Sequence, residues 1–86
     1  MATVKIYTTK MCPYCIAAKR LLKQKDIKIE EIDVTFNYPG RQAMTKKAGG
    51  KTSVPQIFIG DTHVGGCDEL MALERKGALD PMLQAG

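Results

Sequence analysis

Hydrophobic periodicity alternates between two kinds of segment along the whole chain, and this alternation restricts the possible folds more than any other feature. Residues 3–8 alternate polar and apolar side chains and are rich in β-branched residues, which indicates a strand, and residues 28–34 repeat the pattern less regularly. Residues 13–25 place apolar side chains on one side and basic ones on the other, which indicates an amphipathic helix. If the two strands share a sheet, they are parallel and the crossover is right-handed.

The next part of the chain predicts a second helix and then a hairpin. Residues 38–47 form the helix, with Asn37 as its cap and Pro39 in its first turn. Residues 56–59 and 62–64 form antiparallel strands, because a glycine at position 60 supplies the positive φ that a type II′ turn requires.

A last helix and a short helical turn complete the predicted order. Acidic side chains in the first turn and basic ones in the last suit a helix over residues 68–76, which Gly77 ends. Leu79, Met82 and Leu83 predict a short terminal turn. We therefore expect an α/β fold in which a mixed four-stranded sheet is flanked by three or four helices.

Length and composition indicate one domain, residues 1–86, and exclude several functional classes. With 44% hydrophobic and 26% charged residues, the chain is neither disordered nor collagen-like. The net charge of +4 favours anionic partners, but the sequence has no run of five or six like charges and no stacking platform that would indicate nucleic acid binding. No apolar stretch is long enough to span a membrane and no export signal is recognisable, so we expect a cytoplasmic protein.

The motif Cys12-Pro13-Tyr14-Cys15 lies directly after the first predicted strand, where the first helix begins. This placement puts Cys12 at the N-cap and Pro13 at the first helical position, where its missing N–H costs nothing. A sulfur at the cap can accept hydrogen bonds from the N–H groups of Tyr14 and Cys15 and lies near the positive end of the helix dipole, and both favour a thiolate. The thiolate is the nucleophile of disulfide exchange, so we predict that Cys12 attacks and that the less exposed Cys15 resolves the product.

Zinc binding is an alternative interpretation of the cysteines. Cys12, Cys15, His63 and Cys67 are side chains of the types that zinc prefers, although 47 residues separate Cys15 from His63. An odd number of cysteines without an export signal favours redox chemistry over a structural disulfide. On its own, His63 is interpreted as an exposed side chain of the hairpin.

Two further segments are expected beside the cysteines if the predicted fold is right. Residues 52–56 lead into the third strand, and Pro55 suits a strand start, with the Val54–Pro55 bond either cis or an ordinary trans bond. Residues 65–68, Gly-Gly-Cys-Asp, join the fourth strand to the last helix. They form either a loop that presents a helix N-terminus to a carboxylate or simply a tight turn.

Three motifs together resemble a dithiol glutaredoxin, particularly the small bacterial type. They are residues 12–15, Ser-Val-Pro-Gln-Ile-Phe-Ile at 53–59 and Gly-Gly-Cys-Asp-Glu-Leu at 65–70. Each motif alone is only moderately specific, but their order and spacing are strongly so, and the resemblance covers essentially the whole chain. It implies a thioredoxin-like fold, which agrees with the predicted sheet.

The resemblance also implies an enzyme, a glutathione-dependent thiol–disulfide oxidoreductase of electron transport and cell redox homeostasis. It implies that Cys12 attacks glutathione mixed disulfides and protein disulfides and that Cys15 resolves protein disulfides. Glutathione is then the reductant and co-substrate, and no bound cofactor or metal is expected. The implied partners are glutathione and disulfide-containing proteins, with ribonucleotide reductase as a candidate, and the chain is expected to be a monomer that binds neither nucleic acid nor membrane.

The resemblance further assigns a glutathione site around the cysteines. Val54 would pair its backbone N–H and C=O with the cysteinyl part of glutathione, beside a cis Pro55. Asp68 would pair with the γ-glutamyl ammonium, and N–H groups at Gly66 and Cys67 would bind its carboxylate. The other residues expected in the site are Tyr14, which flanks the groove, Arg41 and Lys10, which attract the glycine carboxylate, and Ser53, which replaces a commoner threonine.

The chain departs from the family pattern just before the first cysteine. Thr9 stands where the family usually has a basic residue, and Lys10 follows it. Met11 replaces the usual small hydroxyl residue.

Two other functions stay open at this point. One is a glutaredoxin-like protein reduced by thioredoxin reductase, against which Asp68 and the Gly65-Gly66 loop argue by supplying a glutathione site. The other is a binding module that carries zinc or a bridging iron–sulfur cluster. Pro13 argues against the cluster, because family members that hold one stably usually have a different, often single-cysteine, motif.

Overall fold

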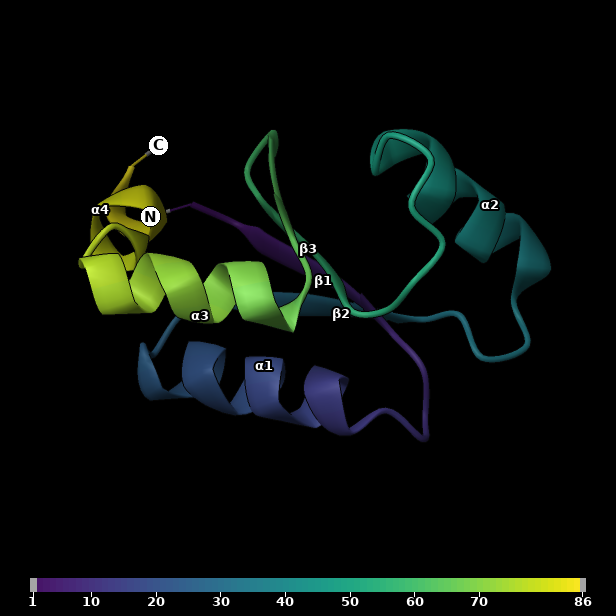
Figure 1. The fold of residues 1–86 in the computed structure, drawn as a ribbon, viewed down its shortest axis with the longest axis horizontal. Helices are drawn as coiled ribbons and strands as arrows, with labels where there is room; N and C mark the ends of the chain where they lie inside the picture. Colours follow the sequence, from purple (N-terminus) through teal and green to yellow (C-terminus); the bar gives the residue numbers. More distant parts are fainter. Residues whose placement is uncertain (1, 86) are drawn as a thin grey trace.

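The computed structural model describes residues 2–85 and has a four-stranded sheet with helices on both faces (Figure 1). Its strands are β1 (Val4–Thr8), β2 (Ile29–Asp33), β3 (Gln56–Ile59) and β4 (Thr62–Gly65), in the order β2-β1-β3-β4. β1 and β2 are parallel, whereas β3 is antiparallel to both β1 and β4. The predicted mixed sheet is therefore confirmed.

The helices follow the predicted order with small shifts at their ends. They are α1 (Pro13–Gln24), α2 (Tyr38–Lys47), α3 (Cys67–Lys76) and α4 (Leu79–Gln84). α3 begins one residue before the prediction, because Gly66 has an extended backbone and acts as the N-cap. Among the described residues, no helix is both long and apolar enough to cross a membrane.

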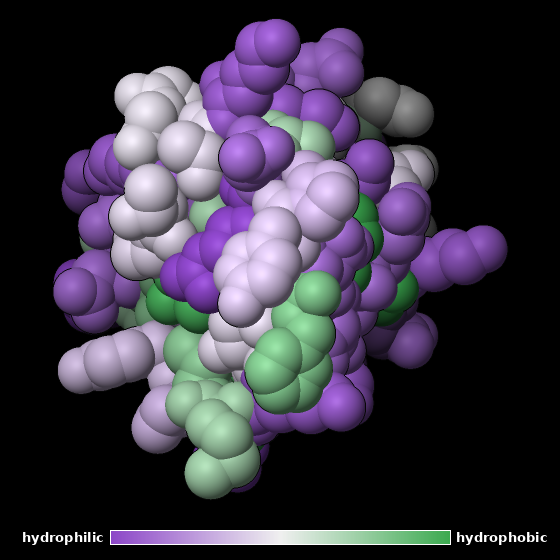
Figure 2. Space-filling view, turned by 90° about the vertical axis from the view of Figure 1, so that its right-hand side faces the viewer, coloured by the Kyte–Doolittle hydropathy of each residue, from purple (hydrophilic) through white to green (hydrophobic). Residues whose placement is uncertain are grey.

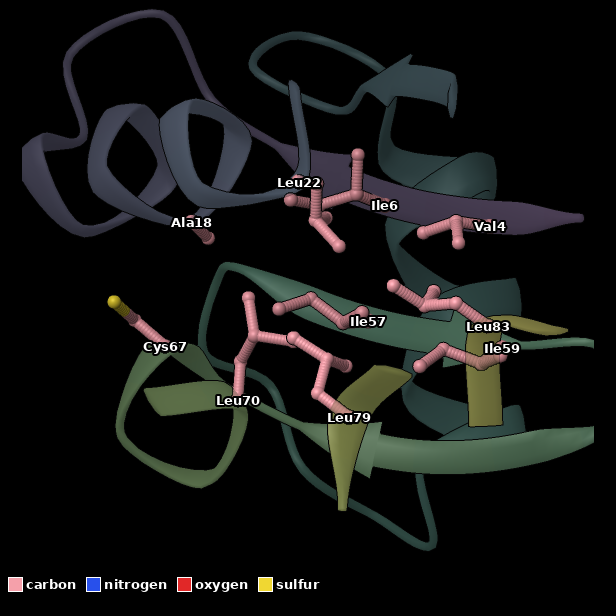
Figure 3. Packing of buried hydrophobic residues seen from close by; sticks show 10 residues of the cluster. All are labelled: Val4, Ile6, Ala18, Leu22, Ile57, Ile59, Cys67, Leu70, Leu79 and Leu83. Atoms are coloured by element: carbon pink, nitrogen blue, oxygen red, sulfur yellow. The ribbon is translucent and has the colours of Figure 1, made fainter. Parts of the chain in front are cut away.

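The two faces of the sheet carry separate hydrophobic clusters. On one face, apolar residues of α1, α3 and α4 pack against β1 and β3 (Figure 3). That cluster consists of Val4, Ile6, Ala18, Leu22, Ile57, Ile59, Cys67, Leu70, Leu79 and Leu83. On the other face, Met44 of α2 and Ala48, which caps the end of that helix, pack with Tyr7, Val34 and Phe58. Burying both faces fixes the strands and hence the positions of the loops between them.

The topology brings three loops to one end of the sheet. Tyr7, near the carboxyl end of β1, pairs with Gln56 at the amino end of β3. Ile57 pairs in turn with Gly65 at the carboxyl end of β4. The segments that follow β1, precede β3 and follow β4 therefore meet, as the sequence analysis expected for residues 12–15, 52–56 and 65–68.

The hairpin contains one confirmed prediction and one correction. Gly60 has φ +58, the left-handed backbone that its place in the turn requires. His63 was interpreted as an exposed side chain, and this is wrong. The ring is half-buried and stacks on Phe58, with 4.8 Å between ring centroids, because the pairing of β3 with β4 places the two side chains together.

Candidate active site

Cys12 caps the amino terminus of α1 with its sulfur. Its backbone is extended, and Sγ accepts a hydrogen bond from the Cys15 N–H at 3.2 Å. Pro13 follows at the first helical position, so the predicted cap is confirmed, with Cys15 as its donor. The sulfur therefore lies at the positive end of the helix, where a negative charge is stabilised.

A hydrogen-bond chain from β2 holds the loop before Cys12. The Lys10 N–H donates to Thr35 Oγ1 at 2.9 Å, and the Thr35 hydroxyl donates to Asp33 Oδ1 at 2.6 Å. The Thr35 N–H also donates to Asp33 Oδ1, and these two bonds lower the pKa of Asp33, the hydroxyl contributing most. This anchor was not predicted, although Asp33-Val34-Thr35 has the spacing of a turn in which an aspartate accepts from the backbone two residues on.

Cys15 lies deeper than Cys12. Its exposed fraction is 1%, against 8% for Cys12, so Cys12 is the more accessible of the two sulfurs. Burial raises the pKa of Cys15 to about 12, and the hydrogen bond with Cys12 adds to the effect. Cys15 is consequently held as a neutral thiol at physiological pH. The order of reaction of the two cysteines stays a prediction.

The segment before β3 lies against the cysteine cap. The Cys12 thiol donates to the Val54 carbonyl oxygen at 3.8 Å. Pro55 is buried, and the Val54–Pro55 bond is cis, one of the two states that the sequence allowed. Ser53 is exposed beside them. This segment therefore lies beside the Cys12 sulfur, as the family resemblance implied for Val54 and Pro55.

Arg41 approaches the same segment from α2. Its guanidinium donates from Nε and Nη2 to the Thr52 carbonyl oxygen, at 3.3 and 2.9 Å. A hollow of about 450 Å³ opens beside it, lined by Tyr38, Arg41, Gln42, Thr45, Lys46 and Thr52. Arg41 thus holds the backbone of this segment in addition to any ligand that it attracts.

The loop between β4 and α3 forms the other side of the site. Gly65 has φ +115, and the Gly66 N–H donates to Glu69 Oε1 at 2.6 Å. A Cβ on Gly66 would lie 3.5 Å from the Pro55 carbonyl oxygen, so this loop lies directly beside the segment before β3.

Asp68 and Cys67 follow on the first turn of α3. The Asp68 carboxylate is exposed, whereas Cys67 is buried at the edge of the core with its sulfur pointing toward α1 (Figure 3). Burial raises the pKa of Cys67, and the nearby charges of Asp68 and Cys12 raise it further. Cys67 is therefore a buried thiol of the core.

Large apolar side chains are exposed around the cysteine loop. We call them the apolar rim; its members are Met11, Tyr14, Ile16, Phe36 and Tyr38. The hydrogen bond between Lys10 and Thr35 brings the two loops that carry most of them together. Figure 2 shows this side of the molecule, where hydrophobic side chains gather among polar ones. An exposed apolar cluster of this kind marks a contact surface.

The structure does not assemble the four side chains considered for zinc. Among residues 2–85, no three His, Cys, Asp or Glu side chains are placed to hold a metal ion. His63 instead contacts Gln56 Oε1 through its Nε2, at 2.7 Å.

Comparison with known proteins gives a consistent result. A family model described as Glutaredoxin matches residues 4–64. The chain is 54% identical over 85 residues to a protein of Pseudomonas aeruginosa named glutaredoxin, covering 99% of this chain and 100% of that one. The solution structure of a Brucella melitensis glutaredoxin is similar with a TM-score of 0.85 and 48% identity, over 98% of this chain and 90% of that one. The crystal structure of a buckwheat glutaredoxin–glutathione complex is similar with a TM-score of 0.85 and 32% identity, over 95% and 76%.

The raised pKa of Cys15 predicts slow alkylation of this thiol in mildly alkaline solution. In Cys12→Ser, the Cys15 side chain stays buried. The pH at which its alkylation by iodoacetamide reaches half of the maximum rate should therefore still lie well above 9.0, the ordinary pKa of a thiol. The reaction is followed by mass spectrometry of the peptide that carries Cys15, with the urea-unfolded chain as control. A half-maximal rate in the folded protein at or below the pH found for the unfolded control would contradict the raised pKa of Cys15.

Gly65→Ala should destabilise the loop beside the site. The backbone at φ +115 disfavours a side chain, and the new Cβ would lie 2.7 Å from Glu69 Oε1, the acceptor for the Gly66 N–H. We expect a loss of about 1–3 kcal/mol in the free energy of unfolding, measured by urea titration. Gly49→Ala is the control, because its φ of +68 also disfavours a side chain but nothing lies within 4 Å. An equal or smaller loss for Gly65→Ala would show that the Glu69 contact is unimportant.

Proposed function

Since the chain belongs to the glutaredoxin family, whose members are thiol–disulfide oxidoreductases that use glutathione as reductant, we propose that Cys12 and Cys15 are its catalytic cysteines. The observation that carries this proposal is the Cys12 sulfur at the amino terminus of α1, which accepts the Cys15 N–H at 3.2 Å. The same hydrogen bond stabilises negative charge on the attacking sulfur before reaction and on the leaving sulfur afterwards.

Reduction of a glutathione mixed disulfide needs only Cys12. Its thiolate attacks the glutathione sulfur, so a Cys12–glutathione disulfide forms and the target leaves as a thiolate that takes up a proton. The thiolate of a second glutathione then attacks the sulfur of the bound glutathione. Oxidised glutathione leaves, and the Cys12 thiolate is restored with two electrons transferred to the target.

Reduction of a protein disulfide also uses Cys15. Cys12 attacks one sulfur of the target, and the other sulfur leaves as a thiol after protonation. Cys15 then loses its proton, attacks the Cys12 sulfur and releases the second target thiol, which leaves a Cys12–Cys15 disulfide. Two glutathione molecules reduce this disulfide. The raised pKa of Cys15 keeps it protonated until a leaving thiolate can accept the proton.

Glutathione is proposed to lie between the segment before β3 and the loop that joins β4 to α3. Val54 would pair its N–H and C=O with the cysteinyl unit, as an edge strand pairs with an added strand. This pairing would lie beside Pro55 and next to the Cys12 sulfur. α3 begins at Cys67, and the N–H groups of its first turn suit the γ-glutamyl carboxylate, whereas the Gly66 N–H already donates to Glu69 Oε1. Asp68 is exposed on the same turn and suits the ammonium. The similarity to a glutaredoxin solved with glutathione supports this placement.

The glycine end of glutathione is proposed to point toward α2. Arg41 and Lys46 line the hollow beside Thr52, so a carboxylate there would meet two positive charges. Lys10 and Tyr14 are exposed on the cysteine side of the groove, and Ser53 is exposed between the two sides. These residues complete the proposed binding site.

The apolar rim supports protein disulfides as a further class of substrate. A mixed disulfide of glutathione alone would leave most of these side chains in water, whereas a protein partner could cover them. Ribonucleotide reductase is a candidate partner on the family resemblance alone. We propose a cytoplasmic monomer in which residues 1–86 form one domain.

Replacing each cysteine separately tests the proposed chemistry. Cys12→Ser should lower turnover of a small glutathione mixed disulfide by roughly a thousandfold or more, because the nucleophile is lost. Cys15→Ser should keep this activity but lose most reduction of a protein disulfide. Turnover is measured with glutathione, glutathione reductase and NADPH. Full activity of Cys12→Ser would refute the assignment.

Asp68→Asn tests glutathione recognition separately from the thiol chemistry. Loss of the exposed carboxylate should raise the apparent KM for the glutathione mixed disulfide by roughly three- to tenfold, with kcat little changed. A mixed disulfide of free cysteine, which has no γ-glutamyl group, should be used by both proteins at similar rates. Asp61→Asn, at the far end of β3, is the matched control. Equal KM values for parent and Asp68→Asn would place the γ-glutamyl group elsewhere.

A further inference from the structure

The buried side chain of Gln56 donates to the segment that lies beside the reactive sulfur. Gln56 is the first residue of β3, and its exposed fraction is 1%. Its Nε2 donates to the Ser53 carbonyl oxygen at 3.0 Å and to the Ser53 hydroxyl at 3.3 Å. A buried amide without partners would be costly, so these bonds set the position of the segment relative to the sheet.

The other end of the amide is held by His63. His63 Nε2 lies 2.7 Å from Gln56 Oε1, and because that oxygen can only accept, Nε2 carries the proton. The imidazole also stacks on Phe58, with an interplanar angle of 28°, so its orientation is fixed by the sheet. The amide therefore cannot rotate without losing contacts at both ends.

The three carbonyl groups of residues 52–54 each accept from a side chain of a different element. Thr52 accepts from Arg41 of α2, Ser53 from Gln56 of β3, and Val54 from the protonated Cys12 thiol at the start of α1. When Cys12 is a thiolate it cannot donate, and the bonds from Arg41 and Gln56 remain. Such a run of side-chain donors takes the place of the backbone pairing that a strand would provide. It fixes the peptide planes at the point where glutathione is proposed to pair.

The bond from Gln56 determines the direction of one particular N–H. The Ser53 carbonyl and the Val54 N–H belong to the same peptide unit, and the unit is planar and trans, since the cis bond lies one residue later. In a trans unit the C=O and N–H point in opposite directions. When Gln56 holds the carbonyl on the protein side, the Val54 N–H is directed away from Gln56.

We propose that Gln56, held by His63, is a positioning residue for glutathione recognition, because it orients the Val54 N–H that pairs with the cysteinyl unit. The inference rests on the proposed function, in which Val54 binds glutathione. Gln56 and His63 act through the Ser53–Val54 peptide unit and take no part in electron transfer. Their effect should consequently appear in substrate binding and not in the reactivity of the thiol.

Gln56→Met removes the hydrogen bonds to Ser53 and to His63 while keeping an unbranched side chain that tolerates burial. We expect the apparent KM for the glutathione mixed disulfide to rise by roughly tenfold, the effect of losing one well-oriented hydrogen bond, with kcat within about twofold. Alkylation of Cys12 by iodoacetamide, measured in a Cys15→Ser background, should stay within about twofold of the parent, because this reagent needs no pairing with Val54.

Two more variants separate positioning from folding. Gln56→Glu keeps an acceptor for His63 but places a carboxylate oxygen against the Ser53 carbonyl, so its KM should rise at least as much. His63→Phe keeps an aromatic ring on Phe58 but leaves Gln56 Oε1 without its donor, so an intermediate rise is expected. Gln24→Met, at the exposed end of α1, should behave like the parent. Thermal unfolding of each variant reports whether it is folded at the assay temperature.

The outcomes distinguish this inference from the proposed function. If the parent shows no preference for the glutathione mixed disulfide over that of free cysteine, the glutathione site itself is wrong, and the inference fails with it. If the parent has the preference and a folded Gln56→Met or Gln56→Glu keeps the parent KM, Gln56 has no positioning role. A rise in KM accompanied by an equal fall in the rate of Cys12 alkylation would also overturn the inference, because it would indicate a general distortion of the site.

Discussion

The hydrogen bond from the Cys15 N–H to the Cys12 sulfur is the interaction on which the rest of the site depends. It makes the reactive group part of a helix cap, so the sulfur is held at the positive end of α1 by the same geometry that starts the helix. Cys15 follows inside the first turn, where burial keeps its thiol neutral. One local structure thus gives two neighbouring cysteines different chemistry.

The cap is useful only because the sheet brings other loops to it. β3 runs antiparallel to both β1 and β4, so the segments before Gln56 and after Gly65 come to the same end as Cys12. Each of these segments lacks regular strand pairing and is held by side chains instead, namely Arg41, Gln56 and Glu69. These side chains support the segments where a strand partner would otherwise do so.

Local sequence patterns predicted the helices and strands well, because their caps and turns are determined by neighbouring residues. Asn37 accepts from the Gly40 N–H as a cap, Gly60 has the positive φ that its turn requires, and Cys12 begins α1. The hydrogen bonds that join Gln56 to Ser53 and to His63 were not predicted. His63 and Gln56 lie on different strands, and their contact requires the pairing of β3 with β4, which brings His63 beside Phe58. In the sequence, Gln56 resembles an ordinary strand residue. Its partners are Ser53, which precedes the Val54–Pro55 bond, and His63, which lies on the neighbouring strand.

The order of elements, the cysteine cap and the residue types available to the site follow from local sequence, because periodicity and capping act over a few residues. The family resemblance added the expected glutathione contacts. The burial of Cys15 and Cys67, the support of the loop at Lys10 and the side chain that holds the Ser53 carbonyl depend instead on how distant segments pack. Burial and contacts between distant segments depend on how the sheet and helices pack together, and neighbouring residues carry no direct record of that packing.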